Sequence, residues 1–400
     1  MALLVRRVGA RHLDLCEDAV QAALLAALEA WSAGAVPEEP AAWLHQVAYR
    51  RVIQELRQRA GRERLLAAAA DELAAGATVA PDVPDAPAPR FSEELRDDLL
   101  RMLFVVCDER VPAESQLVLA LKTLCGFSTA EIAARLLISE ASVHKRLGRA
   151  RERLRELAPD VDTPPLTTLR ARLPGVHAVL YVLFCEGYLS THGASAIRRE
   201  LCDEALRLAT LTAEHPVGEG AESAALVALM HLHVARLGAR VDATGGLLLL
   251  EEQDRTRRDM SHLHAGMAWL ASSAEGDVFS RFHAEAGIAA AHALAPSFAA
   301  TPWAEIAGLY QLLERVAPQP VHTLNHAVAL AEARGPEAGL ALIEHLAPPS
   351  WLADSYLWDA VLADLHGRAG HVEAAARHRQ RALAEAPGEA VRALLARRLR

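Results

Sequence analysis

The sequence predicts an all-α protein with two small helical domains and a larger, helical C-terminal part. Hydrophobic residues make up 52% of the chain but aromatic residues only 4%. The abundant Ala, Leu, Arg and Glu favour helices over strands, and apolar residues recur at helical spacings along the chain. Because 400 residues exceed what one hydrophobic core usually organises, we expect three domains.

The opening residues predict two helices, the second of which has a basic face. An apolar stripe marks the first helix, which ends within residues 34–40, and the second begins near Ala41. The stripe contains Leu15, Ala19, Ala22, Leu24, Leu28 and Trp31. We expect the second helix to turn apolar side chains inward and arginines outward. The inward residues are Trp43, Leu44, Val47, Ala48 and Leu56, and the outward ones are Arg50, Arg57 and Arg59.

Prolines predict where the domains end. Residues 75–89 contain Pro81, Pro84, Pro87 and Pro89, which prevent a regular helix and favour an extended tether. A second proline-containing joint follows at residues 159–165. We therefore predict a first domain at 1–74, a linker at 75–90, a second domain at 91–158 and a helical extension at 166–400.

The segment Phe127–Glu156 carries the strongest local pattern. Ser128 and Glu131 have the spacing of a capping box at the start of a helix. A short apolar turn follows, and Ser139 is placed to cap a second helix. Apolar residues repeat along this second helix at a spacing that keeps them on one face, namely Val143, Leu147, Ala150 and Leu154. The segment therefore predicts a helix-turn-helix.

The outward face of the second helix is basic and suits the major groove of DNA. Its residues are Ser142, Lys145, Arg146 and Arg149. An ordinary helical hairpin with solvated charges is the alternative, but the capping residues, the short turn and the clustered charge all agree with DNA binding.

The distribution of charge agrees with two DNA-binding elements. The formal net charge of −9 argues against a protein with basic surface all over. Residues 50–64 nevertheless carry a net charge of +4, and residues 144–155 carry +5. Positive charge is thus confined to two short segments, while the acidic remainder discourages indiscriminate binding to DNA.

The C-terminal part looks like stacked helix pairs. Two similar segments begin at Leu324 and Leu357, and their glycines, Gly335 and Gly370, lie 35 residues apart. This spacing is close to the period of tetratricopeptide repeats, about 34 residues, in which each helix pair needs neighbours to bury its apolar face.

These motifs resemble a known family. The run TAEIAARLLISEASVHKRLGRARERLRE is similar to the promoter −35-reading region of sigma-70-type factors of the extracytoplasmic-function group. LDLCEDAVQAALLAALEAW and PAAWLHQVAYRRVIQELRQR resemble the domain of these factors that grips the polymerase clamp and opens the −10 element. VLYVLFCEGYLSTHG, LCDEALRLA and LLLLEEQDRTRRD resemble the long, tetratricopeptide-like extension of one subgroup.

The resemblance implies a sigma factor that directs core RNA polymerase to promoter DNA, with an extension that tunes its activity through an intramolecular or protein partner. It assigns polymerase binding to Asp18 and Gln21. It assigns the −10 element to His45, Tyr49, Arg50, Arg51 and Arg57, and the −35 element to Ser142, Lys145, Arg146, Arg149 and Arg153. Stacking rings and backbone-binding cations are what an opened strand needs.

The sequence departs from the family at three places. Family members usually have another helix before the position of Leu13, and here only about a dozen residues precede it. We therefore expect either a first domain that is truncated at its N-terminus or a start of the chain that is wrongly chosen. An acidic residue often stands at the position of Gln54, and an asparagine at that of Cys185. A stand-alone helix-turn-helix regulator, or a repeat scaffold with a vestigial DNA-binding motif, is therefore retained as an alternative.

We expect no enzyme activity, cofactor or bound metal. The pairs His231/His233 and His262/His264 place alternate residues on diverging sides of a helix, which disfavours a metal site. The five cysteines, Cys16, Cys107, Cys125, Cys185 and Cys202, have no zinc-site spacing and suit a reducing cytoplasm. Neither a signal peptide nor a membrane span is predicted.

A dense charged cluster follows the apolar run Leu247–Leu250. It contains Glu251, Glu252, Asp254, Arg255, Arg258 and Asp259. Our hypothesis at this level is that the cluster docks the extension against the other domains or against the polymerase.

Overall fold

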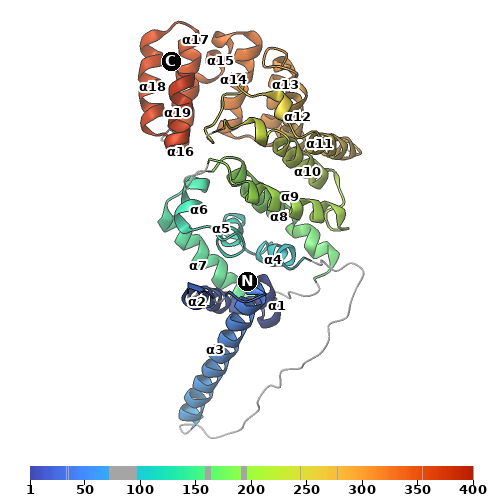
Figure 1. Cartoon of the computed structure of the whole chain (residues 1–400), viewed down its shortest axis with the longest axis vertical. Helices are drawn as coiled ribbons and strands as arrows, with labels where there is room; N and C mark the ends of the chain where they lie inside the picture. Colours follow the sequence, from blue (N-terminus) through green and yellow to red (C-terminus); the bar gives the residue numbers. More distant parts are fainter. Residues whose placement is uncertain are drawn as a thin grey trace. The chain divides into compact units, whose positions relative to one another are not determined.

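The computed structural model describes residues 1–32, 34, 36–71, 97–157, 164–190, 196–243, 245–276, 278–353 and 355–399. Within these ranges every regular element is a helix (Figure 1). One isolated antiparallel β-bridge joins Val241 and Leu247, without forming a strand. The all-α prediction is confirmed.

The N-terminal segment forms three α-helices. They are α1 (Ala2–Val8), α2 (Leu13–Ser32) and α3 (Pro40–Asp71), with a short 3-10 helix, η1 (Ala10–His12), after α1. Gly9, with φ of 95°, turns the chain between α1 and η1, a conformation that residues with a side chain rarely adopt. Thus a helix does precede Leu13.

The apolar stripe of α2 is buried only in its first half. Leu15 and Ala19 are buried, whereas Leu24 and Leu28 are 42% and 69% exposed. The stripe predicted the helix, but a periodic pattern does not say how far a neighbouring helix extends along it. Near the end of α2, the ring of Trp31 lies 5.5 Å from that of Trp43 on α3.

The basic face of α3 lies as the sequence predicts. Ala48 and Val52 are buried, and Arg50, Arg57 and Arg59 are exposed. The helix therefore presents its cations to solvent along one side.

Four helices follow in the second sequence segment. They are α4 (Asp98–Val106), α5 (Ala113–Thr123), α6 (Thr129–Leu136) and α7 (Glu140–Leu157). Asp97 caps α4, because its carboxylate accepts a hydrogen bond from Leu100 N at 2.8 Å. From Leu100 to Val106 every side chain of α4 is buried, so this helix supplies much of the local core.

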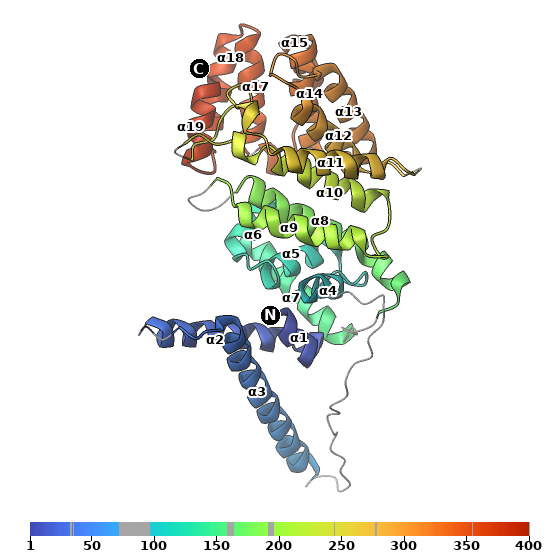
Figure 2. The same cartoon turned by 45° about the vertical axis from the view of Figure 1, so that its right-hand side comes forward.

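The remaining helices build the extension (Figure 2). Among them α10 is apolar on nearly all sides and packs against α9, α11 and α12. The helices are α8 (Leu166–Tyr188), α9 (Arg199–Glu214), α10 (Ala221–Val234), α11 (Met260–Ser273), α12 (Arg281–Leu294), α13 (Trp303–Val316), α14 (Pro320–Arg334), α15 (Pro336–Ile343), α16 (Ser350–Ala353), α17 (Tyr356–Arg368), α18 (Val372–Ala384) and α19 (Glu389–Arg398), with 3-10 helices η2 (Leu237–Ala239) and η3 (Arg255–Arg257).

The two similar segments of the sequence form two helix pairs, α14 with α15 and α17 with α18. Gly335 and Gly370 stand at the turns inside these pairs, with φ of 95° and 81°. An apolar core that includes Leu324, Ile343 and Trp358 joins the first pair to α17. The likeness to tetratricopeptide repeats stays a prediction.

The chain divides into two compact units, residues 1–126 with 145–172, and residues 127–144 with 173–400. The last of the three boundaries between the units lies inside α8, just before Leu173 and Pro174; a proline cannot donate a helical hydrogen bond. The proline-rich linker and residues 159–163 of the predicted joint lie outside the described residues, so the predicted boundaries there stay predictions.

No helix in the described ranges is long and apolar enough to cross a membrane. None of the five cysteines forms a disulfide within the described residues, and Cys16, Cys107 and Cys202 are buried.

Candidate nucleic-acid interface

Capping side chains define both helices of the predicted helix-turn-helix. Ser128 Oγ accepts a hydrogen bond from Glu131 N at 3.1 Å, and the Glu131 carboxylate accepts one from Ser128 N at 2.7 Å. This reciprocal pair is the predicted capping box. Ser139 Oγ accepts from Ser142 N at 3.2 Å at the start of α7, so both predicted caps form.

A strained turn joins α6 to α7. Leu137 has φ of 53° and ψ of 46°, the left-handed conformation that side chains disfavour. Its N–H closes α6 by donating to the carbonyl of Ala134. The side chain is 47% exposed, so the position is defined by its backbone rather than by packing.

The inner face of α7 follows the predicted spacing. Val143 and Ala150 are fully buried, and Leu147 and Leu154 are 4% and 1% exposed. Burying four consecutive members of one helical face fixes the rotation of α7 about its axis. The basic residues are thereby directed to the remaining faces.

Two cations on the outer face of α7 are exposed and make no ion pair among the residues that the structure describes: Lys145 and Arg149. The other predicted −35 residues have local partners. Arg146 pairs with Glu114 of α5 at 2.7 Å, and Arg153 pairs with Glu156 at 2.9 Å. Ser142 bonds to the capping Ser139. Lys145 and Arg149 are therefore the cations most available to a phosphate or a base edge.

A different side of α7 is held by carboxylates of α2. Arg151 Nε lies 3.0 Å from Asp14 Oδ1, and its Nη2 pairs with Glu17. Arg155 Nη2 lies 3.1 Å from Asp14 Oδ2. The sequence analysis missed these pairs, because nothing local connects residues about 140 positions apart. The cations of α7 therefore fall on two sides. The paired side contains Arg151 and Arg155, and the free side contains Lys145 and Arg149.

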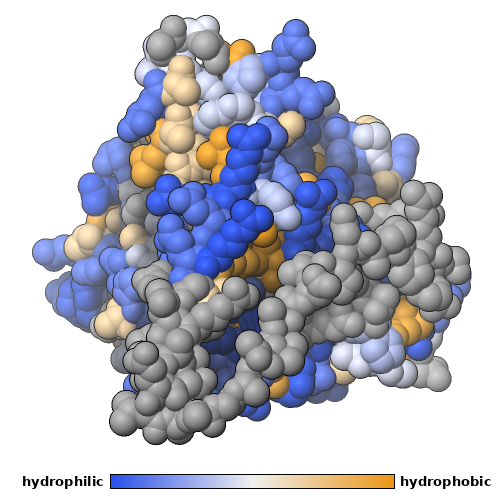
Figure 3. Space-filling model, turned by 90° about the horizontal axis from the view of Figure 1, so that it is seen from below, coloured by the Kyte–Doolittle hydropathy of each residue, from blue (hydrophilic) through white to orange (hydrophobic). Residues whose placement is uncertain are grey.

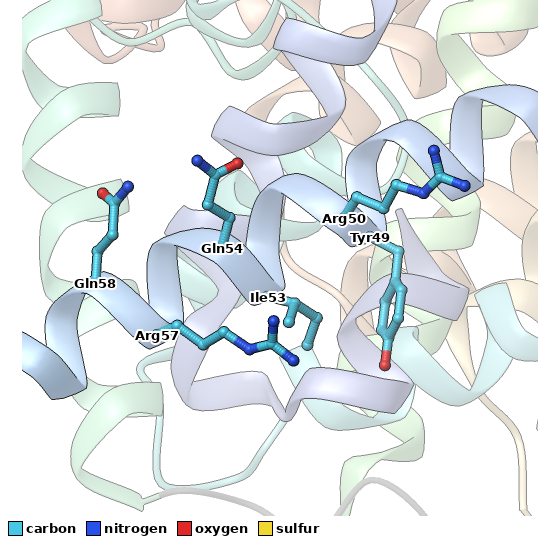
Figure 4. Close-up of a pocket in the computed structure, with 6 residues that line it drawn as sticks. All are labelled: Tyr49, Arg50, Ile53, Gln54, Arg57 and Gln58. Atoms are coloured by element: carbon cyan, nitrogen blue, oxygen red, sulfur yellow. The ribbon is translucent and has the colours of Figure 1, made fainter.

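The predicted −10 residues lie along α3. A hollow with a volume of about 590 Å³ is lined by Tyr49, Arg50, Ile53, Gln54, Arg57 and Gln58. Figure 4 shows Tyr49, Ile53 and Arg57 on one side of the helix, and Arg50, Gln54 and Gln58 on the adjacent side. Arg51 is exposed outside this lining. The hollow combines an aromatic ring with two cations.

Aromatic and cationic groups meet at the base of this face. The rings of His45 and Tyr49 are stacked at 6.2 Å, and the Arg7 guanidinium lies 5.6 Å from the centre of the Tyr49 ring. Burial, and then the charge of Arg7, lower the pKa of His45. His45 is therefore neutral at neutral pH, and the positive charge here comes from arginine.

The predicted polymerase-binding residues, Asp18 and Gln21, are exposed on α2. On the same helix Leu25 and Leu28 are 62% and 69% exposed. Figure 3 shows that hydrophilic side chains cover most of the coloured surface seen from below, with smaller hydrophobic patches between them. Exposed leucines beside polar groups are typical of a protein contact surface.

A buried ion network that the sequence analysis did not find secures the start of α8. Asp108 is fully buried and binds Arg110 through both carboxylate oxygens, at 2.8 and 2.7 Å. Arg172, 4% exposed, reaches Asp108 at 2.5 Å and Glu109 at 2.9 Å. Burial alone would raise the pKa of Asp108, but the bonds from Arg110 and the charge of Arg172 lower it.

The extension holds α6 through two further ion pairs. Arg198 lies 3.1 Å from the capping-box Glu131, and its guanidinium lies 5.7 Å from the centre of the Phe127 ring. Arg135 lies 3.7 Å from the buried Glu186 of α8. The backbone of Arg198 lies close to that of Gly187, because the Arg198 backbone N–H donates to Gly187 O at 2.8 Å. A side chain at Gly187 would collide with Arg198 O, so the glycine permits this contact. These contacts were also missed.

The remaining sequence candidates have structural partners. His231 on α10 and His262 on α11 are hydrogen-bonded through their Nδ1 atoms, which lie 2.9 Å apart. Within the described residues, no group of three or more side chains is arranged to bind a metal ion. Glu251 and Glu252 pair with Arg398 and Arg397. Arg255 and Arg258 bond to carbonyls at the end of α12, whereas Asp254 and Asp259 accept hydrogen bonds from Thr256 and Ser261, two residues further along the chain. Several members of the charged cluster thus bond within the extension itself, and the docking hypothesis stays a prediction.

Comparison with known proteins assigns two parts of the chain. Residues 104–154 match the family described as sigma-70, region 4, and residues 172–274 match a family of unknown function, DUF6596. An uncharacterized protein of Rhizobium meliloti (strain 1021), R00370, is 37% identical over 344 residues, which is 84% of this chain and 78% of that protein.

This chain belongs to the family of that rhizobial protein. The region 4 match covers the helix-turn-helix, so this chain carries a sigma-like, DNA-binding domain of the kind that acts in transcription. In this chain the match to DUF6596 begins at Arg172, after the region 4 match ends. No solved structure matches the chain.

Proposed function

We propose that this protein is a sigma factor of the extracytoplasmic-function group, which directs core RNA polymerase to specific promoters. The observation that carries the proposal is the region 4 match over a helix-turn-helix whose outer face presents Lys145 and Arg149. In the proposal α7 reads the −35 element, with Ser142, Arg146 and Arg153 completing its contact surface.

In the proposal, residues 1–74 bind the −10 element and the polymerase. The hollow on α3 offers Tyr49 as a stacking ring and Arg50 and Arg57 as backbone-binding cations, a combination that suits single-stranded DNA. His45 and Arg51 flank it. On α2, Asp18, Gln21 and the exposed leucines form the proposed polymerase contact.

In this proposal residues 1–74 and 91–158 act as the two sigma domains, joined by the linker 75–90, and residues 166–400 are a tetratricopeptide-like extension. Promoter DNA and core polymerase are the partners. The proposed protein works in the cytoplasm, without a membrane, cofactor or metal, and is not an enzyme.

The extension is proposed to support promoter reading by holding α6. Support comes from the ion pairs Arg198–Glu131 and Arg135–Glu186, which fix the first helix of the DNA-binding motif. The Ser128 hydrogen bonds and the Arg198 charge lower the pKa of Glu131 although burial opposes them, so this carboxylate stays ionised and paired at neutral pH.

Run-off transcription tests the proposed function. Purified full-length chain and core RNA polymerase are incubated with promoter fragments selected from host genomic DNA. We expect transcripts that require both proteins and that are lost with Arg149→Ala. DNA binding without any polymerase-dependent transcript would instead identify the stand-alone regulator, in which the first domain does not engage the polymerase.

A second comparison isolates the role of the extension. Arg198→Ala removes the pair with Glu131, whereas Arg199→Ala removes an exposed neighbour that pairs with Asp203 on its own helix. We expect transcription to fall several-fold in the first variant and to stay unchanged in the second. Equal transcription by both would disprove tuning through this contact.

A further inference from the structure

A cluster of cationic and imidazole side chains lies inside the extension, at the ends of α10 and α12. We call it the arginine cluster, and its residues are Arg236, Arg240, Arg255, Arg258, His233 and His292. Arg236 is 8% exposed, and the other five are half-buried. The charge of each arginine acts on other members of the cluster, so they form one electrostatic unit.

Two of these arginines close the C-terminus of α12. Arg255 Nη1 donates to Ala295 O at 2.9 Å and to His292 O at 3.2 Å. Arg258 donates to His292 O at 3.1 Å and also to Ala293 O. Carbonyls at a helix C-terminus carry roughly half a negative charge in total, so this contact compensates only a small part of the positive charge.

The other two arginines also bond to neutral groups. Arg236 Nη2 donates to Gln253 Oε1 at 3.2 Å. Arg240 donates to Tyr188 O, and its guanidinium lies 3.7 Å from the centre of the Tyr188 ring. Throughout the described part of the chain, no carboxylate lies within 4.0 Å of any of the four guanidiniums.

The nearby carboxylates are engaged elsewhere. Asp254 accepts from Thr256, and Asp259 caps α11 through Ser261 and His262. Burial, and then the charges of Arg255 and Arg236, lower the pKa of Arg258 to about 10. Like charges gathered in a partly buried site cost folding free energy unless an anion offsets them.

Three buried nitrogens in the cluster have no hydrogen-bond partner: Arg255 Nη2, His233 Nδ1 and His292 Nδ1. Burial and the surrounding arginines lower the pKa of both imidazoles to about 3. Both rings are therefore neutral at neutral pH, and each has one N–H to donate. Unpartnered buried polar atoms are uncommon in folded proteins and require an explanation.

We propose that the arginine cluster binds a small oxyanion of the phosphate type, either free phosphate or the phosphate group of a small metabolite. Guanidinium groups match phosphate oxygens in shape and charge. A dianion compensates more of the excess charge than a carboxylate does, and its oxygens can accept from several donors at once. Residues Pro296 and Ser297, just beyond α12, are exposed, so the cluster lies near solvent.

Ligand-dependent stability tests this site in the full-length chain. Thermal unfolding is measured with inorganic phosphate, with glycerol 3-phosphate and with citrate, each at the same ionic strength set by chloride. All compounds are compared at one common concentration, and where this is about a hundredfold above Kd we expect the Tm to rise by roughly 5–10 °C. A larger shift with glycerol 3-phosphate would identify a metabolite, and an equal shift would identify free phosphate.

Two outcomes overturn the proposal: no shift with either phosphate compound, or an equal shift with citrate. Thermal unfolding does not depend on transcription. The test of the oxyanion site is therefore independent of the proposed sigma function.

Matched variants locate the binding. Arg255→Gln removes the charge but keeps an amide that can donate to the carbonyls of α12. Arg257→Gln is the control, because Arg257 lies on the same 3-10 helix, is exposed and donates to Val241 O instead. Arg236→Gln, which caps no helix, is a second variant in case Arg255→Gln fails to fold. We expect phosphate binding to weaken at least tenfold in the cluster variants only. Unchanged binding in Arg236→Gln, or an equal loss in Arg257→Gln, would refute the site.

Discussion

Arginines in two regions of this molecule have different kinds of partner. Around α7 and the start of α8, Arg146, Arg151, Arg155 and Arg172 each have a carboxylate within 3.1 Å. In the arginine cluster of the extension, the four guanidiniums bond only to carbonyls, an amide oxygen and a ring. Both regions contain buried or half-buried arginines, such as Arg172 and Arg236, but only the first also provides counter-charges.

The presence or absence of a carboxylate partner indicates which arginines are structural and which can bind a ligand. A paired guanidinium has its charge offset within the fold, so its role is to hold helices together. An unpaired cation can take an anion from outside the fold: in our proposals this is DNA phosphate for the exposed Lys145 and Arg149, and a small oxyanion for the arginine cluster. Changing the carboxylates should therefore alter stability, whereas changing the unpaired cations should alter binding.

The largest expected effect is at Asp108. Asp108→Ala leaves the buried Arg172 without its closest partner, and we expect a loss of about 3–5 kcal/mol of unfolding free energy, measured by denaturant unfolding. Glu109→Ala is the matched control, because Glu109 binds the same arginine but is 42% exposed; it should cost less than about 1 kcal/mol. Equal losses would show that the pairing of Arg172 is not what stabilises this region.

Acid should remove the contribution of Asp108. Its folded pKa is lowered, so between the folded pKa and the unfolded value of about 3.9 only the unfolded state binds the proton. Its stabilisation is complete above the unfolded pKa and is lost as pH falls through the folded one. The stability gap between wild type and Asp108→Ala should shrink over this window, and a gap that is constant with pH would contradict the lowered pKa.

The next effect concerns promoter affinity. Arg149→Ala should weaken binding to a selected promoter by about 1–3 kcal/mol and reduce the salt dependence by about one phosphate contact. Arg155→Ala, on the side of α7 paired with Asp14, should change promoter affinity less. Fluorescence anisotropy over a range of salt concentrations measures both. If the two variants behave alike, the separation of α7 into paired and free sides has no functional meaning.

The helix-turn-helix could be predicted because its signals are local. The Ser128/Glu131 spacing, the capping Ser139 and the periodic burial of α7 each involve residues within one or two turns, and the structure forms all of them. The candidate −35 and −10 residues were proposed on the same basis, with the family resemblance. Their arginines and lysine on α7 and α3 are exposed, except Arg146, which is half-buried.

The long-range pairs could not be predicted in this way. Arg172 meets Asp108 across 64 positions, and Arg198 meets Glu131 across 67. Helical periodicity tells which face of a helix a residue occupies, but not which helix packs beside it. For the same reason the exposed end of the α2 stripe and the meeting of His231 with His262 were missed.

A smaller effect should follow from releasing the paired side of α7. The double change Asp14→Asn and Glu17→Gln removes the carboxylates bound to Arg151 and Arg155. The Arg155–Asp14 pair is exposed and the Arg151 pairs are partly buried, so we expect the loss of stability to stay within about 1–2 kcal/mol. The affinity for non-specific duplex DNA should depend more steeply on salt concentration, by the amount expected for about 1–2 additional phosphate contacts. The reason is that each released arginine can bind a phosphate and displace a counterion. An unchanged slope, measured with a random-sequence duplex, would mean that α2 does not restrain these arginines.

The smallest effect is at the turn between α6 and α7. Leu137 adopts φ of 53°, a conformation that costs a side-chain-bearing residue roughly 1–2 kcal/mol. Glycine avoids this cost but loses about 0.5–1 kcal/mol of backbone entropy, and little packing is lost because Leu137 is 47% exposed. Leu137→Gly should therefore stabilise the domain by up to about 1 kcal/mol, and Leu137→Val should destabilise it, since β-branched residues tolerate this conformation worst. Denaturant midpoints for the two variants measure this, and a Gly variant less stable than the Val variant would show that the turn relies on the leucine side chain and not on its backbone.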